Sequence, residues 1–256
     1  MTEPLLSAEL TARYGSTRVL EAVCFALSSG EVLGLVGQSG SGKSTVALAL
    51  LRLLRFRGGS LSGSIRFAGQ DLLTLPEKQM RALRGRRIGF VPQSPAAALN
   101  PLLRLSTHLT EAWRAHSRES ASFGKVLASV NLPCTPEFLA RYPAEISVGQ
   151  GQRFLIAMGI LHSPALLIAD EPTSALDVIT QADILALFRS INQERGTAIL
   201  YISHDLLSVA SLCHRVAILE RGTLVETGTT EQIFRRPQHP YTQKLVAAIP
   251  RNPWTL

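Results

Sequence analysis

Short apolar runs, each bounded by glycine or polar residues, recur along the chain. Four of them are apolar throughout instead of alternating with polar positions: residues 32–36, 165–169, 198–202 and 216–219. A continuous apolar run of this length is typical of a strand that is buried on both faces, as in a parallel sheet. The pattern therefore predicts a buried, largely parallel sheet.

Helical periodicity occupies segments between these runs. Residues 44–54 and 178–194 have helix-like patterns, and Gly196 ends the second. The alternation of strand and helix predicts an α/β fold. Outside the first of these helices, residues 10–70 contain short alternating strands, which predict a small antiparallel β region beside the parallel sheet.

Two segments depart from the alternation. Residues 94–163 carry helical patterns without a strand-like run, which predicts a helical subdomain inserted into an α/β core made of residues 1–93 and 164–230. Residues 231–256 include Pro237, Pro240, Pro250 and Pro253, and we expect this tail to wrap along the core instead of folding alone.

Composition excludes several classes of protein. With 256 residues, 46% hydrophobic and 18% charged, the chain is neither disordered nor of low complexity. No stretch approaches the roughly 18 uncharged apolar residues of a membrane-spanning helix, and the N-terminus lacks the pattern of a secretion signal. We therefore expect a cytosolic chain that does not cross a membrane. Its three cysteines lack any paired spacing and are expected to be buried hydrophobic side chains.

The formal net charge of +7 comes almost entirely from arginine, concentrated at residues 52–57 and 81–87. Such clusters can bind nucleic acid or an anionic membrane, or they can form a solvated face. Stacking aromatics are absent from both stretches, and aromatic residues make up only 6% of the chain. The solvated face is the favoured interpretation, and we expect no nucleic-acid partner.

A glycine-rich segment links the first apolar run to the helix that follows it. Its sequence fits G-x-x-x-x-G-K-[ST], a loop whose backbone N–H groups surround phosphate oxygens at the start of a helix. Lys43 would neutralise the β- and γ-phosphates and Ser44 would ligate Mg²⁺. The alternative is an ordinary glycine-rich turn. The residues predicted to hold the nucleotide here are Gly37, Gln38, Ser39, Gly40, Ser41, Gly42, Lys43, Ser44 and Thr45.

Two acidic residues follow the second apolar run. Asp170 and Glu171 would lie at the carboxyl end of a buried strand, where ligands collect in open α/β sheets. Asp170 would hold Mg²⁺ and Glu171 would polarise the attacking water as a general base. The alternative is an acidic helix cap before Pro172.

The motifs around these two segments resemble those of ABC ATPases, in the family's order and over essentially the whole chain. Residues 146–150, Ile-Ser-Val-Gly-Gln, are similar to the LSGGQ signature. Gln93 matches the Q-loop, Asp177 the D-loop and His204 the H-loop. Tyr14 matches the aromatic residue that stacks on adenine, although a tyrosine on a strand is more often a packing residue.

The resemblance implies the remaining site residues. It implies that ATP is contacted by Tyr14, Ser147, Gly149, Gln150 and Asp177, in addition to the glycine-rich loop. It implies catalytic roles for Lys43, Gln93, Glu171 and His204. It implies Mg²⁺ ligation by Ser44, Gln93 and Asp170.

One residue departs from the family pattern. Val148 replaces the first glycine of the signature, and this puts a β-branched side chain where the family has none. If the position required a positive φ, valine would introduce backbone strain of about 1–3 kcal/mol. On this hypothesis we expect a heterodimer, in which a partner's signature serves this chain's phosphate loop.

The fold implied by the resemblance is a P-loop ABC-type α/β core with an antiparallel β subdomain and an inserted helical, signature-bearing subdomain. The implied activity is ATP hydrolysis with Mg²⁺. The implied partners are a second ABC ATPase subunit, two membrane permeases contacted through the Q-loop and the helical subdomain, and indirectly an extracytoplasmic substrate-binding protein. The chain would then be peripheral, on the cytoplasmic face of the cell membrane.

Finer motifs resemble the importers for peptides, nickel or metal chelates. They are Ala-Leu-Asn-Pro at 98–101 and Gln-His-Pro-Tyr-Thr at 238–242. The alternative is the ATPase subunit of a soluble enzyme assembly such as a carbon–phosphorus lyase complex, whose ATPases share the tail motif. Chromosome and repair ATPases are excluded, because the chain lacks their long coiled-coil insertion.

Overall fold

The computed structural model describes residues 3–249 and divides the chain into two compact units. The first unit combines residues 1–77 with 198–256, and the second is residues 78–197. Pro250 and Pro253 of the tail lie outside the described residues. The predicted helical subdomain, 94–163, falls within the second unit.

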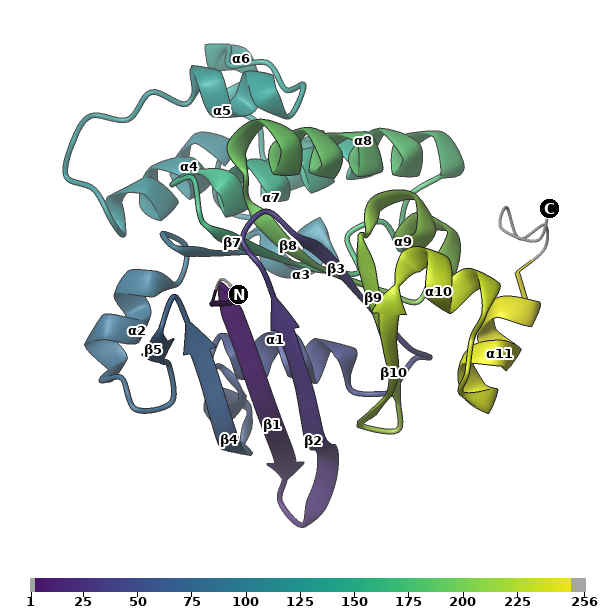
Figure 1. Ribbon diagram of the computed structural model, residues 1–256. Coiled ribbons are helices and arrows are strands. Elements are labelled where there is room, and N and C mark those ends of the chain that lie inside the picture. Colours follow the sequence, from purple (N-terminus) through teal and green to yellow (C-terminus); the bar gives the residue numbers. More distant parts are fainter. Residues whose placement is uncertain (1–2, 250–256) are drawn as a thin grey trace. The chain divides into compact units, whose positions relative to one another are not determined.

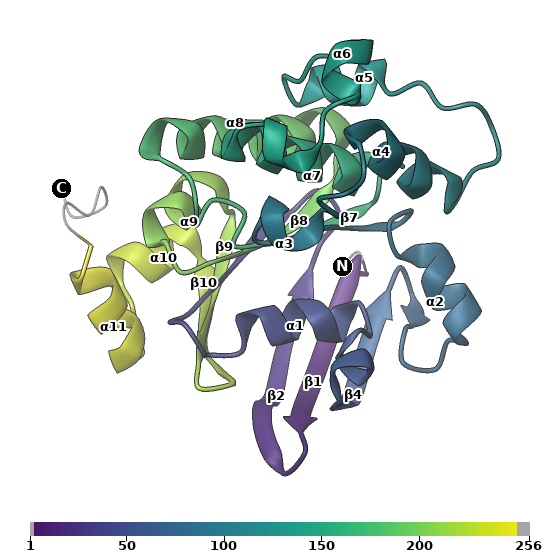
Figure 2. The same ribbon diagram turned by 180° about the vertical axis from the view of Figure 1, so that it is seen from behind.

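The first unit contains an antiparallel sheet in the strand order β2-β1-β4-β5 (Figure 1). Side chains of strand β1 alternate between buried and more exposed positions, and the buried ones include Leu6 and Leu10. Helix α1 crosses β1 and β2, as Figure 2 shows. The element bounds are β1 Leu6–Tyr14, β2 Thr17–Leu27, β4 Gly59–Phe67, β5 Gln70–Asp71 and α1 Lys43–Leu50.

Parallel strands form the centre of the same unit. Strand β3 pairs in parallel with β8 on one side and β9 on the other, while β10 is antiparallel to β9. All residues of β3 and β8 are buried, as their continuous apolar runs predict. The bounds are β3 Val32–Val36, β8 Ala198–Ser203, β9 Arg215–Glu220 and β10 Thr223–Thr229.

Helices complete the first unit. Helix α9, Leu206–Leu212, packs on β3, where a Cβ at Gly34 would lie only 2.7 Å from Val209. The tail contains two helices, α10 Thr230–Arg235 and α11 Pro240–Ala247, and α10 contacts β9 and β10. The proline-rich tail is therefore more regular than the sequence indicated. A short 3₁₀ helix, η1, covers Leu54–Arg57.

The second unit holds two parallel strands, with only helices between them along the chain. Helices α7 and α8 run through this unit, and Gly196 ends α8 with a φ of 63°, as predicted. The strands are β6 Ile88–Val91 and β7 Leu166–Asp170. The helices are α2 Glu77–Leu83, α3 Pro95–Ala98, α4 Leu105–Arg114, α5 Gly124–Ser129, α6 Pro136–Leu139, η2 Pro143–Glu145, α7 Val148–Ile160 and α8 Val178–Arg195.

These elements confirm the predicted α/β fold with its antiparallel β region. Helix α1 ends at Leu50, earlier than residue 54, and Arg52 just beyond it has a φ of 53° that a helix does not accommodate. Among residues 3–249, no helix is both long enough and apolar enough to span a bilayer.

The cysteines differ from the expectation that all three are buried. Cys213 is buried, but Cys24 and Cys134 are exposed. Cys24 lies on the more exposed face of β2, because successive side chains of a strand point to opposite faces of the sheet. Which face a residue occupies does not follow from its residue type. Burial raises the pKa of the Cys213 thiol, so that its reactive thiolate is disfavoured.

Alkylation should distinguish these thiols. At pH 8, iodoacetamide should modify Cys24 and Cys134 in the folded protein, while Cys213 should react only after unfolding. Mass spectrometry of peptides after timed quenching would measure the three rates. Cys213→Ala serves as the control, since it should leave the fast phase unchanged. Rapid labelling of Cys213 in the native protein would contradict its burial.

Candidate active site

The glycine-rich loop joins β3 to α1 within the first unit, and its lysine is buried. Lys43 has an exposed fraction of only 5%. Its Nζ donates hydrogen bonds to the carbonyl oxygens of Gly37 at 2.8 Å and Gln38 at 3.1 Å. The ammonium is therefore held over the first peptides of its own loop.

Close packing fixes one side of this loop and leaves the other open. A Cβ at Gly37 would lie 2.3 Å from the carbonyl oxygen of Leu219, and Gly42, with a φ of 104°, would place one 2.7 Å from Leu20. At Gly40, with a φ of 80°, no atom lies within 4 Å of the same position. The loop therefore backs onto the strands at Gly37 and Gly42, and its backbone is open at Gly40.

Polar groups of this loop fit a phosphate group. Within the described residues, the buried hydroxyl of Ser41 has no hydrogen-bond partner. No side chain caps α1, so that the N–H groups of its first turn, including those of Ser44 and Thr45, have no side-chain acceptor. Unpaired N–H groups at a helix start attract anions. The exposed hydroxyl of Ser44 is a suitable ligand for Mg²⁺ on such a phosphate.

His204 lies at the same sheet edge as this loop. It is the exposed residue directly after β8, and Ser203 before it pairs in register with Val36, the residue before Gly37. Parallel register therefore brings the start of the phosphate loop and His204 to neighbouring strand ends.

Tyr14 closes β1 at the turn into β2. A Cβ added at Gly59 would lie 3.0 Å from its ring, so the tyrosine packs against β4. Leu20, on the other strand of the hairpin, is the residue that contacts Gly42. The packing role is thus observed, and adenine stacking stays a prediction.

In the second unit, the two acidic residues follow β7. Asp170 is its buried last residue, whereas Glu171 is partly exposed. Glu171 has a φ of 47°, a left-handed conformation that is uncommon for a side chain of this kind. Such strained backbone persists where the surrounding structure fixes it, and it often occurs at functional sites.

Gln93 contacts the second acid. Its Nε2 donates to Glu171 Oε2 at 3.3 Å and to Ser174 Oγ at 3.2 Å, and Ser174 Oγ donates to the Glu171 carbonyl at 3.1 Å. Strand pairing explains why Gln93 and Glu171 are in contact. Val91 pairs with Ala169, and Gln93 and Glu171 each lie two positions after one of these paired residues. Gln93 and Glu171 were both predicted as site residues, whereas Ser174 was not, although it begins the segment 174–177 that matches the D-loop.

The signature segment starts α7. Ser147 is the N-cap, its Oγ accepting from Gln150 N at 3.2 Å while Gln150 Oε1 accepts from Ser147 N at 3.1 Å. A Cβ at Gly149 would lie 2.9 Å from Thr180 on α8. Gly149 therefore permits close contact between two helices, a constraint that the sequence did not reveal.

The strain expected at Val148 is absent. Val148 is the first residue of the right-handed helix α7 and is not among the residues of positive φ in the described chain. The positive-φ hypothesis was therefore wrong, since a helix start is accessible to valine. Its side chain is 55% exposed.

Asp177 caps α8. Its carboxylate accepts from the backbone N–H groups of Ile179 and Thr180 and from the Thr180 hydroxyl. The backbone hydrogen bond from Thr180, followed by that from its hydroxyl, lowers the pKa of Asp177. A structural role is thus observed for this residue, and contact with a nucleotide stays a prediction.

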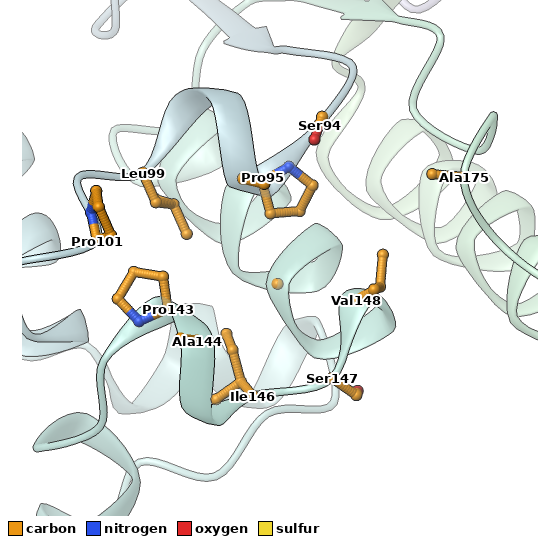
Figure 3. Close-up of a pocket in the computed structure, with 12 residues that line it drawn as sticks. Ser94, Pro95, Leu99, Pro101, Pro143, Ala144, Ile146, Ser147, Val148 and Ala175 are labelled. Atoms are coloured by element: carbon orange, nitrogen blue, oxygen red, sulfur yellow. The ribbon is translucent and has the colours of Figure 1, made fainter.

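An apolar pocket of about 380 Å³ lies beside the signature segment, within the second unit (Figure 3). One wall is formed by residues between 94 and 101, just after Gln93 in the sequence. The other is formed by residues between 143 and 151, which lead into α7 and form its first turn. Val148 points along its edge, and Ala175 comes from the loop after Glu171. The lining residues are Ser94, Pro95, Ala96, Leu99, Pro101, Pro143, Ala144, Ile146, Ser147, Val148, Gly151 and Ala175.

Metal ligands are not gathered into a protein cage. Among residues 3–249, no cluster of three or more His, Cys, Asp or Glu side chains is suited to a metal ion. Mg²⁺ commonly uses one or two protein ligands together with substrate phosphates. Ser44, Asp170 and the amide oxygen of Gln93 have the oxygen chemistry that this arrangement requires.

Comparison with known families adds independent support. Residues 20–174 match the family described as "ABC transporter", and residues 225–255 match "Oligopeptide/dipeptide transporter, C-terminal region". The first match covers more than half of the chain.

Curated relatives carry transport names. The chain is 43% identical to the peptidoglycan transport ATP-binding protein YejF of Agrobacterium fabrum, covering 98% of this chain and 48% of that protein. It is 41% identical to the oligopeptide transport ATP-binding protein OppD of Bacillus subtilis, with coverages of 92% and 68%. It is 43% identical to the glutathione import ATP-binding protein GsiA of Escherichia coli, with coverages of 89% and 38%. The chain thus spans about half the length of the first relative and less of the third.

Two solved structures are similar to this chain over most of its length. A dimeric ATP-binding cassette in a post-hydrolysis state with ADP and Pi has a TM-score of 0.74 at 25% identity, covering 88% of this chain and 98% of that one. An ATP-binding subunit of an ABC transporter has a TM-score of 0.76 at 27% identity, with coverages of 95% and 98%.

Proposed function

This chain belongs to the ABC transporter ATP-binding proteins, and from that premise we propose that it is the ATP-hydrolysing subunit of a peptide importer. The observation that carries the proposal is the match of residues 225–255 to the C-terminal region of oligopeptide and dipeptide transporters. The names of the relatives, which specify oligopeptides, glutathione and peptidoglycan, support a cargo containing peptide bonds. Nickel or a metal chelate stays an untested alternative.

A soluble enzyme assembly is the competing function. The motifs alone do not separate it from transport, because the tail motif resembles both. The transport names of the relatives favour the importer. Association with a membrane permease is the property that distinguishes the two.

The proposed chemistry divides between the two units. Lys43 and the backbone of the phosphate loop bind the β- and γ-phosphates, and His204 at the same edge contacts the γ-phosphate. Glu171, oriented by its bond to Gln93, accepts a proton from the attacking water. Ser44 in the first unit and Asp170 in the second are the proposed ligands of Mg²⁺, which would supply positive charge against the phosphates. Positioning and electrostatic stabilisation suffice for phosphoryl transfer.

A second ATPase subunit completes each site in the proposed mechanism. ATP lies between the phosphate loop of one subunit and the signature of the other, and Ser147, Gly149 and Gln150 face the partner's nucleotide. We retain a heterodimer as the proposal, although the strain argument for it no longer holds. Its remaining support is the exposed branched side chain of Val148 at the start of the signature helix.

The pocket of Figure 3 is the proposed docking site for a permease helix. Its walls connect the segment after Gln93 with the signature segment, so an inserted apolar side chain would touch both at once. Movement of either wall on ATP binding would then reach the permease. The chain would lie at the cytoplasmic face of the membrane through this contact, and an extracytoplasmic binding protein would deliver the cargo.

The general base is tested by Glu171→Gln. This change preserves the size of the side chain but removes the proton acceptor, so turnover in the assembled transporter should fall by roughly 10²–10⁴ while ATP still binds. ATPase assays and nucleotide binding measure the two effects separately. Turnover like that of the unmodified protein would show that Glu171 is not the base.

The signature valine is tested by Val148→Gly. Because φ is already helical, the change should relieve no strain, and the free energy of unfolding should shift by no more than about 1 kcal/mol. ATPase activity with the partner subunit should rise or stay unchanged, since a smaller side chain would face the nucleotide. A tenfold fall in activity with folding intact would mean that the valine is required.

The docking site is tested by Ala96→Arg, with Ala97→Arg as the matched control. Both alanines are exposed on α3, but only Ala96 lines the pocket. Coexpressed with the permease subunits of its proposed transporter, the unmodified chain should sediment with membranes. Ala96→Arg should reduce this fraction at least about fivefold, because it buries a charge in an apolar contact, and ATP binding should persist.

Equal sedimentation of the Ala96→Arg and Ala97→Arg variants would remove the pocket from the permease interface. Copurification of the unmodified chain with soluble enzymes, and never with a permease, would instead favour the competing function.

A further inference from the structure

The tail motif reaches the phosphate loop. The hydroxyl of Tyr241, at the start of α11, accepts a hydrogen bond from the backbone N–H of Gln38 at 3.2 Å. Both residues belong to the first unit, although 203 positions separate them. The mechanism described above gives Tyr241 no role.

The hydrogen bond to Tyr241 restrains the peptide group between Gly37 and Gln38. The Gln38 N–H and the Gly37 carbonyl belong to the same planar unit, and they point in opposite directions. Lys43 Nζ donates to that carbonyl at 2.8 Å. Rotating the peptide would therefore break the Tyr241 bond and displace the acceptor of the Lys43 ammonium together.

Tyr241 is itself anchored to the sheet. The carboxylate of Glu226, on β10, accepts from the backbone N–H groups of Gln238 at 2.8 Å and His239 at 3.0 Å. His239 Nδ1 in turn accepts from the Tyr241 N–H at 3.2 Å. Burial alone would raise the pKa of Glu226, but the hydrogen bonds from the backbone N–H groups of Gln238 and His239 help to lower it. The anchor is thus ionised at neutral pH.

We propose that Tyr241 is a positioning residue of the ATP site: its hydroxyl orients the Gly37–Gln38 peptide and, through that peptide, the Lys43 ammonium that binds phosphate. The His-Pro-Tyr segment therefore supports the phosphate loop as well as identifying the branch of the family. The proposal rests on ATP binding at Lys43.

Nucleotide affinity of the full chain tests this role, with MgATP and MgADP as the probes. Tyr241→Phe keeps the ring and removes only the hydroxyl, and it should weaken binding about 3- to 10-fold, the range for one hydrogen bond. Gln243→Ala is the control, because Gln243 donates to Pro237 and Gln238 in the same tail without touching the loop. It should change affinity less than twofold.

A double-mutant cycle separates positioning from general loosening of the tail. Because Tyr241 acts through Lys43, Tyr241→Phe should have little further effect in a Lys43→Ala background, whereas independent losses would add. Melting temperatures without nucleotide would check folding. Should Tyr241→Phe fold poorly, Glu226→Gln keeps the ring but weakens its anchor, and it should reduce affinity in the same direction.

The outcomes are distinct. If Lys43→Ala leaves affinity unchanged, the proposed ATP site itself fails. If Lys43→Ala weakens binding but Tyr241→Phe stays within twofold of the unmodified chain, the positioning role is overturned. Equal losses in Tyr241→Phe and Gln243→Ala, or additive losses in the cycle, would also overturn it.

Discussion

In the proposed ATP site, the loop between β3 and α1 has to stay rigid while directing its own backbone N–H groups at an anion. Internally, the Ser41 N–H donates to the Gln38 carbonyl at 3.1 Å, but N–H groups that are proposed to bind phosphate cannot also hold the loop in place. Support therefore comes from outside: the Leu219 carbonyl presses against Gly37, Leu20 packs on Gly42, and the Gly222 N–H donates to the Ser41 carbonyl at 2.9 Å. The antiparallel sheet, β9 with its turn into β10, and the tail all contribute to this one loop.

Parallel strand register explains how His204, Gln93 and Glu171 are placed. Each of the three lies one or two positions beyond a buried strand whose neighbouring strand is also followed by a predicted site residue. Val36 beside Ser203 brings the phosphate loop and His204 to one edge in the first unit, and Val91 beside Ala169 brings Gln93 to Glu171 in the second. Burial of the apolar side chains fixes the register of these strands, and the register in turn fixes where the polar residues after each strand lie.

The signature helix α7 is positioned by close packing of its glycines and not by strand register. Gly149 admits Thr180, and Gly151 admits Pro95, whose ring would lie about 3 Å from an added Cβ. The signature helix is thereby joined to α8 and to the segment after Gln93. Val148, between the N-cap Ser147 and Gly149, faces outward, and this explains why a branched side chain is compatible with the fold.

The sequence by itself determined four buried strands and the positions of the glycine-rich loop and the acidic pair beside them, because a buried strand has an unbroken apolar run and the loop has its own spacing of glycine, lysine and serine. It also indicated the family, through motifs whose order is independent of any contact. Only the tertiary structure decided that Val148 is unstrained, that Asp177 caps α8, that Cys24 and Cys134 are exposed, and that Tyr241 meets Gln38. Those properties depend on backbone φ, on which face of an element is covered, and on contacts between residues far apart in the chain. A local pattern of residue types carries none of that information.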